Sequence, residues 1–440
     1  MFSGNDNQGN FLGRISIRRN QVASMEGDVE DLEFFQKKIS ERFSELLPNK
    51  KETNHHHTPP LPPSATAATA SPSPAGNVDS PSSAVVSPGE HDGAEDHTPS
   101  WSAGGEGSML SIAWMRTLLD TFLCCEAEFK AVLLMGRDPS QVAKSPLDRL
   151  VPDLLDRVVK ALDVCNAVTH GVEAVKFMQC HAKIVVSSLE NRPFTDGQIR
   201  RARRALAAVL ASIVVDEKEG NGKTTERSWS FGRRNSGSAS SKDRQHMPNF
   251  RSLSWSVAKN WSASKQIQAI SSNLYPPRGG EATGLPLTIY IMNVIVVFVM
   301  WALVTGIPCQ NRAGLASHIP IPKQSNWAHS MSVIQEKIAE EWKKKEKKGS
   351  VGLMDEVVKV EKVAQYLIEF ADNFQFPLEV EKEEEVAAKV AELAEICRRM
   401  EDGLGPLQQQ IREVFHRLVK SRAEVLEVLE HANKASTQNV

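Results

Sequence analysis

The chain has 440 residues with 52 basic and 54 acidic side chains, so its formal net charge at pH 7 is −2. A nearly balanced charge gives no reason to expect a nucleic acid or a strongly acidic substrate as a partner. The length is sufficient for a sizeable hydrophobic core, and the six cysteines form neither a CxxC pair nor a Cys/His zinc spacing, so we interpret them as reduced thiols.

Residues 1–47 are predicted to form a basic N-terminal segment followed by one helix. The basic segment contains no apolar run that would serve as a signal peptide and no lipidation motif, so we expect a cytosolic start. Apolar residues then recur at helical spacing until Pro48, at Leu32, Phe35, Ile39, Phe43 and Leu46. Residues 48–107 are rich in Pro, Ser, Ala, Thr and Gly and are predicted to be a disordered linker.

Residues 108–215 are predicted to form an N-terminal helical region. One apolar stripe of helical period ends near Gly136, and a much longer one follows Ser145 and Pro146. We expect the serine to cap this second helix and the proline to occupy its first turn, with Gly171 as a place where the helix can bend.

A third helix in this region has a complete N-terminal signature. Thr195 and Gln198 have the spacing of a capping box, while Phe194 and Ile199 occupy the two positions of a hydrophobic staple.

Residues 216–249 are predicted to be a second disordered linker, rich in Ser, Gly and Arg. Ser236 follows two arginines and an asparagine, the arrangement favoured by basic-directed kinases, and is a possible phosphosite. Its modification would add about −1.5 to −2 charges beside those arginines.

Residues 250–310 combine an amphipathic stretch with an apolar one. The amphipathic stretch carries possible membrane-surface contacts, since basic and Trp side chains at helical spacing suit an interface: Arg251, Trp255, Lys259, Trp261 and Lys265. Packing of the two tryptophans on a helical bundle fits the same pattern equally well.

The apolar stretch runs from Leu285 to Ile307 and contains no charged residue. At about 1.5 Å per residue it reaches roughly 34 Å, against a hydrocarbon thickness of about 30 Å. Its possible membrane-segment residues are Leu285, Ile289, Val296, Phe298, Trp301, Leu303 and Ile307.

Hydropathy favours a membrane-associated segment, and a single-pass membrane protein is one outcome. Pro286 and Asn293 count against a span, and the basic residues that flank the stretch are evenly divided, so they set no orientation. A helix that is apolar all round is also typical of the centre of a large helical domain. If the helices before and after the stretch form one bundle, a span is excluded. Spanning, shallow insertion and burial therefore remain open.

Residues 311–350 are predicted to be a connector, and residues 351–435 a C-terminal helical region. Three apolar runs follow one another there, separated by Pro377 and by the stretch from Gly403 to Pro406. Short breaks favour antiparallel neighbours, so the predicted fold is all-α, a bundle of long amphipathic helices with coiled-coil-like packing.

Recognisable catalytic motifs are missing from the chain. We found no phosphate-binding Gly-rich loop, HExxH, GxSxG or kinase signature, so we assign no catalytic, cofactor-binding or metal-binding residue and expect a non-enzymatic protein.

Four motifs resemble the plant ROH and BYPASS-related family. They are the run from Gln8 to Gln21, Leu147 to Pro152, Arg251 to Ser256, and Met300 to Val304 with Ile307 to Gln310. The N-terminal FLGRISIRRNQ places the chain closer to the ROH branch.

The resemblance implies an adaptor that binds an Exo-seventy subunit of the exocyst and acts in vesicle secretion, for example in depositing cell-wall polysaccharide or seed-coat mucilage. It implies no catalytic residues. The BYPASS relatives imply an alternative, a membrane-associated regulator of a root-to-shoot signal and of plant development. The expected location is the cytosol and the cytosolic face of membranes, with no oligomeric state indicated.

Overall fold

The computed structural model describes residues 30, 32–47, 108–134, 145–213, 262–279, 283–309, 314–346, 352–375 and 377–438. These residues all belong to one compact unit. Both predicted linkers, most of the N-terminal basic segment, Ser236 and four predicted membrane-surface residues lie outside the described residues; the four are Arg251, Trp255, Lys259 and Trp261.

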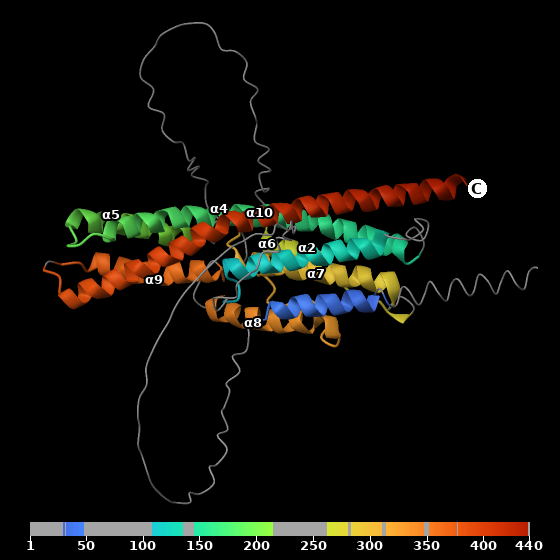
Figure 1. Cartoon of the computed structure of the whole chain (residues 1–440), viewed down its shortest axis with the longest axis horizontal. Coiled ribbons are helices and arrows are strands. Elements are labelled where there is room, and N and C mark those ends of the chain that lie inside the picture. The colour runs from blue at the N-terminus through green and yellow to red at the C-terminus, as the bar shows by residue number, and fades with distance from the viewer. Residues whose placement is uncertain are drawn as a thin grey trace, which may run out of the picture. The chain divides into compact units, whose positions relative to one another are not determined.

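The all-α prediction is confirmed, since the described residues form helices and no strand (Figure 1). In chain order they are residues 32–45, α2 (Ile112–Leu134), α4 (Leu147–Leu189), α5 (Asp196–Ile213), α6 (Ala263–Ser271), α7 (Gly284–Gly306), the 3₁₀ helix η2 (Asn326–Ala328), α8 (His329–Glu346), α9 (Asp355–Asp372) and α10 (Val380–Gln438).

Helices from the two halves of the sequence pack against one another. α4 contacts α10, α5, α7 and α6, while α10 also contacts α2 and α9, and α5 contacts α9. The helices before residue 216 and those after residue 351 therefore form one bundle, and α7 lies against α2, α4 and α6 within it.

Local signals predicted several elements correctly. The five apolar residues of the first helix are all buried. The capping box of α5 is formed, because the Thr195 amide donates to Gln198 Oε1 at 2.8 Å and the Gln198 amide donates to Thr195 Oγ1 at 3.3 Å. Phe194 and Ile199 are buried beside it, as a staple requires.

The predicted break between residues 403 and 406 was wrong, because α10 continues through it as one helix of 59 residues. A Cβ atom on Gly403 would lie 2.7 Å from Ile112 Cγ2, so this glycine permits α2 to approach α10 closely. Pro406 costs the helix one backbone hydrogen bond but does not end it.

One detail of α4 also differs from expectation. Pro146 takes the N-cap position itself and no side chain caps the helix, because Ser145 then lies one residue outside it. Gly171 does not interrupt α4; a Cβ atom there would lie 2.3 Å from the carbonyl oxygen of Pro308, so this glycine serves a close approach to the chain that leaves α7.

The region predicted as a connector contains η2 and α8. The signal was present, since Met331, Ile334, Ile338 and Trp342 recur at helical spacing, and the first three are fully or almost fully buried.

Candidate functional site

The apolar stretch forms α7, which is buried on every face. The structure describes one helix long and apolar enough to cross a membrane, with a mean hydropathy of 2.5, and 94% of its most apolar window is buried within the bundle. The core helix of a soluble protein meets the same criteria of length and composition. All seven residues proposed above as a membrane segment are buried, none more than 5% exposed: Leu285, Ile289, Val296, Phe298, Trp301, Leu303 and Ile307.

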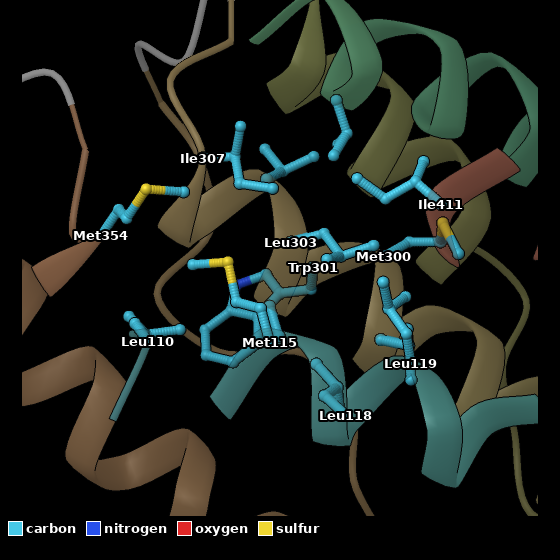
Figure 2. Close-up of a cluster of buried hydrophobic side chains, with 14 of the residues drawn as sticks. Leu110, Met115, Leu118, Leu119, Met300, Trp301, Leu303, Ile307, Met354 and Ile411 are labelled. Atoms are coloured by element: carbon cyan, nitrogen blue, oxygen red, sulfur yellow. The ribbon is translucent and has the colours of Figure 1, made fainter. Parts of the chain in front are cut away.

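Side chains from several helices close around the C-terminal half of α7 (Figure 2). They come from α2 and the turn before it, from α10 and from the residue before α9, and include Leu110, Met115, Leu118, Leu119, Met354 and Ile411. A Cβ atom on Gly306 would lie 2.2 Å from Met115 Cε, the end of a flexible side chain, so the last residue of α7 packs directly against α2. The packing here is formed by aliphatic, methionine and tryptophan side chains.

The amide of Asn293, the polar side chain near the middle of α7, is held by a buried arginine. Arg157 of α4, only 7% exposed, donates from Nη1 to Asn293 Oδ1 at 2.5 Å. Its Nε donates to the carbonyl of Ile270 at 2.7 Å and its Nη2 to that of Ser272 at 3.0 Å, at the C-terminal end of α6. The Asn293 Nδ2 group donates to the Ile289 carbonyl at 3.0 Å. The guanidinium therefore joins α4, α6 and α7.

The surroundings of Arg157 include negative groups that stabilise its positive charge despite burial. Burial lowers the pKa of its guanidinium, and the carboxylates of Asp153 and Asp156 oppose that shift. The carbonyls at the C-terminal end of α6 also carry the negative end of a helix dipole. Sequence reasoning missed this residue, because it is 136 positions away from Asn293.

Two side chains, Trp301 and Gln335, form hydrogen bonds with the backbone of the segment after α7. Trp301 Nε1 donates to the carbonyl of Ala316 at 2.9 Å. Buried Gln335 of α8 accepts from the Ile319 amide and donates to the Ile319 carbonyl, each at 3.3 Å. Both contacts hold backbone, so they position the loop between α7 and α8.

The C-terminal end of α7 is joined to the start of α9 through backbone hydrogen bonds. The amides of Leu353 and Met354 donate to the carbonyls of Thr305 and Gly306 at 3.3 and 3.0 Å. These are carbonyls that a helix end leaves without intrahelical partners.

The N-terminal end of α2 is capped from the same place by Glu356 of α9. Both carboxylate oxygens accept from the Ile112 amide at 3.2 Å. Burial raises the pKa of Glu356, while the hydrogen bonds from its own amide and that of Ile112 oppose the shift.

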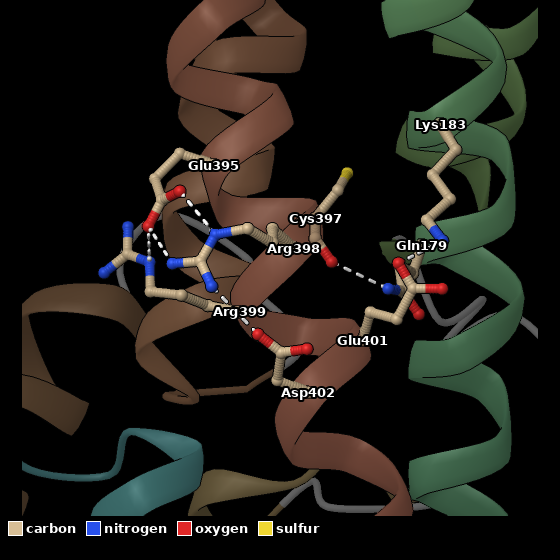
Figure 3. Close-up of polar contacts among 8 residues, drawn as sticks. All are labelled: Gln179, Lys183, Glu395, Cys397, Arg398, Arg399, Glu401 and Asp402. Atoms are coloured by element: carbon tan, nitrogen blue, oxygen red, sulfur yellow. Dashed lines mark hydrogen bonds and ion pairs between the residues drawn. The ribbon is translucent and has the colours of Figure 1, made fainter.

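Polar contacts join α4 to α10 around Gln179 and Lys183, beside ion pairs within α10 itself (Figure 3). Gln179 Nε2 donates to the Cys397 carbonyl at 2.8 Å, and Lys183 pairs with Glu401 at 2.6 Å. Arg398 contacts Glu395 at 2.8 Å and Asp402 at 2.9 Å.

Two adjoining depressions of about 470 and about 220 Å³ open beside these ion pairs. They share Val186, Glu190, Ala394 and Arg398 among their lining residues. An apolar floor with charged edges is suited to binding a protein segment.

Of the predicted membrane-surface residues, Lys265 is the one the structure describes. It is exposed on α6, while Ile267 and Ile270 of the same helix are buried in the bundle. The described end of the amphipathic stretch thus packs on the bundle with its apolar face.

Comparison with known proteins identifies the family. The family model "Protein ROH1-like" matches residues 2–63 and 91–429. Protein ROH1A of Arabidopsis thaliana is 51% identical over 98% of this chain and 98% of its own length. Protein ROH1D of the same plant is 42% identical over 73% of this chain and 82% of its own length. No solved structure matches the chain. The chain therefore belongs to the ROH1-like family.

Proposed function

We propose that this protein is a non-enzymatic α-helical adaptor that binds an Exo-seventy subunit of the exocyst and regulates vesicle secretion in plants, for example the deposition of cell-wall polysaccharide or seed-coat mucilage. The observation that carries this proposal is membership of the ROH1-like family over nearly the whole chain. The resemblance to the ROH branch supplies the partner.

The geometry is compatible with an adaptor. The buried polar side chains Arg157, Asn293, Gln335 and Glu356 all hold helices or loops in place. Such a bundle offers a fixed outer surface, and the depressions between α4 and α10 are its first candidate contact for a protein partner.

A pull-down with purified Exo-seventy paralogues tests the partner. At least one paralogue is expected to be retained by the full chain, and retention of none would overturn the partner assignment. The BYPASS-like alternative would then be preferred, and altered metabolite traffic with normal polysaccharide secretion in plants lacking the protein would support it.

A matched pair of variants tests whether the α4–α10 depressions take part. Ala391 lines the larger depression, whereas Ala423 is an exposed residue of α10 outside both depressions. Ala391→Trp should weaken retention of the paralogue, and Ala423→Trp should not. Equal retention would assign the contact to another surface.

We further propose that α7 stays within the bundle and that the protein meets membranes only at their cytosolic face. Sodium carbonate should then release the protein from a membrane fraction, whereas a spanning protein would be retained. Asn293→Leu sharpens the test, because it makes a spanning helix more apolar but leaves a buried guanidinium short of a partner in the bundle. Retention of both forms would sink this proposal.

A further inference from the structure

The helix at residues 32–45 is called here the N-terminal helix. Its covalent connection to the rest of the described bundle runs through residues 48–107. At 3.3–3.6 Å per residue, a stretch of this length can extend to roughly 200 Å. The covalent connection therefore does not determine where the helix lies. Its contacts must do so.

Those contacts follow the pattern of a helix bound in a groove. Leu32, Phe35, Ile39, Phe43 and Leu46 recur on one face and are each at most 6% exposed. The Phe43 ring meets the Phe298 ring of α7 edge to face, with centroids 5.6 Å apart. The opposite face is in solvent, since Phe34 is 59% exposed.

Two polar contacts fix the register of the N-terminal helix. Arg42 Nη2 donates to Glu128 Oε1 of α2 at 2.6 Å. Trp114 Nε1, also on α2, donates to the Leu46 carbonyl at 2.9 Å. The surface beneath therefore combines an aromatic contact on α7 with a carboxylate and an indole donor on α2.

The helices α2, α4, α5, α6, α7, α9 and α10 are joined to one another by contacts that do not involve the N-terminal helix. α4 packs against α10, α5, α6 and α7, and α2 packs against α7 and α10. Removing the N-terminal helix leaves these pairs intact but uncovers Phe298 and Glu128.

We infer that the N-terminal helix is an exchangeable ligand of this bundle, and that the α2–α7 surface beneath it is a helix-binding groove. Its occupant in the resting chain is residues 32–47 of the same chain. The groove accepts an amphipathic helix with two aromatic residues eight positions apart, as at Phe35 and Phe43, and a basic residue beside the second. This inference does not depend on the proposed partner or membrane association.

Tethering explains why the resting groove stays filled. A ligand that belongs to the same chain as its site binds intramolecularly, so its effective concentration exceeds that of a micromolar competitor, which displaces it poorly. Cutting the connection removes this advantage without altering any contact in the groove.

The test uses the full chain with a protease site inserted between residues 60 and 90. A fluorescent synthetic peptide of residues 30–48 is added to cut and uncut protein, and its binding is followed by fluorescence anisotropy. We expect binding to the cut protein, and at least about tenfold weaker apparent binding to the uncut protein.

Neighbouring phenylalanines supply the control. A peptide with Phe34→Ala should bind like the original, because that ring is exposed. A peptide with Phe35→Ala should bind about a hundredfold more weakly or worse, because that ring is 1% exposed.

Four results would overturn the inference. They are no binding to cut protein, equal binding to cut and uncut protein, equal binding of the two alanine peptides, and loss of helical circular dichroism on cutting. The last would mean that the N-terminal helix is an inseparable part of the core.

Discussion

α7 carries no charged side chain and is buried on every face, whereas α10 buries one face and lines the other with ion pairs of its own. Many of the α10 pairs join residues three or four positions apart, such as Lys382 with Glu385 and Arg398 with Asp402. The Asn293 amide oxygen and the last carbonyls of α7 are instead satisfied by other elements. An exposed helix face can therefore supply ion pairs from within the helix, while the Asn293 oxygen and the last carbonyls of the buried helix depend on neighbouring elements.

The largest expected effect comes from placing a charge on each helix. Val296 of α7 is 0% exposed and Val419 of α10 is 43% exposed. Val296→Arg buries an unpaired guanidinium and should lower the free energy of unfolding by about 4 kcal/mol or more, enough to prevent folding of a marginal protein. Val419→Arg should change it by less than about 0.5 kcal/mol.

Urea denaturation followed by circular dichroism measures both variants. Equal stability of the two would mean that α7 is not enclosed as described. Because the substituted residue and the new side chain are identical, the difference reports the environments of the two positions.

A smaller effect is expected from breaking the polar anchor of α7. Arg157→Met leaves Asn293 Oδ1 and two α6 carbonyls without their donor, and Asn293→Leu takes one acceptor from the guanidinium. Each should cost about 1–3 kcal/mol. The double variant should cost less than the sum, because the two groups interact directly. Additive costs would show that the hydrogen bond between them does not couple α4 to α7.

Two glycines of α10 should respond with opposite signs. A Cβ atom at Gly405 meets nothing within 4 Å, so Gly405→Ala should stabilise the protein by about 1 kcal/mol through helix propensity. The same atom at Gly403 meets Ile112, and Gly403→Ala should destabilise it by about 1–3 kcal/mol. Thermal melts of the two variants decide this, and stabilisation by both would mean that α2 does not press on Gly403.

These glycines also show which features of the fold could not be predicted from the sequence. Apolar periodicity predicted the N-terminal helix, α2, α4, α5 and α9, because burial of one helix face leaves a local pattern. Gly403 was wrongly predicted to lie in a break, and the close approach at Gly171 was not predicted, because the role of a glycine depends on the atom facing it. Those atoms belong to Ile112 and Pro308, far away in the sequence.

The same limit applies to the candidate site. The composition of α7 fits both a core helix and a membrane span, since both environments exclude water on every side. The polar residue Asn293 counted against a membrane span, but the sequence could not show what binds its side chain, because its partner Arg157 lies on another helix. The apolar residues of α8 recur at helical spacing in the sequence, but this region was predicted only as a connector.

The last expected effect is a change in pH dependence at the junction that receives the end of α7. Burial raises the pKa of Glu356 above its ordinary value of 4.5, so between these two pKa values the folded state binds more protons than the unfolded state. The contribution of this carboxyl to stability therefore falls as pH rises through that interval, and is least favourable above the folded-state pKa.

Glu356→Gln keeps an oxygen for the Ile112 amide and removes the titration, so it should change stability at pH 7 by less than about 1 kcal/mol. Relative to this variant, the natural protein should gain stability as pH is lowered from 7 toward 4.5. Glu126, whose pKa is also raised by burial, is present in both proteins, so its effect cancels in the difference. Parallel stability curves across this range would mean that Glu356 is hydrated, and that the N-terminal end of α2 has a different cap.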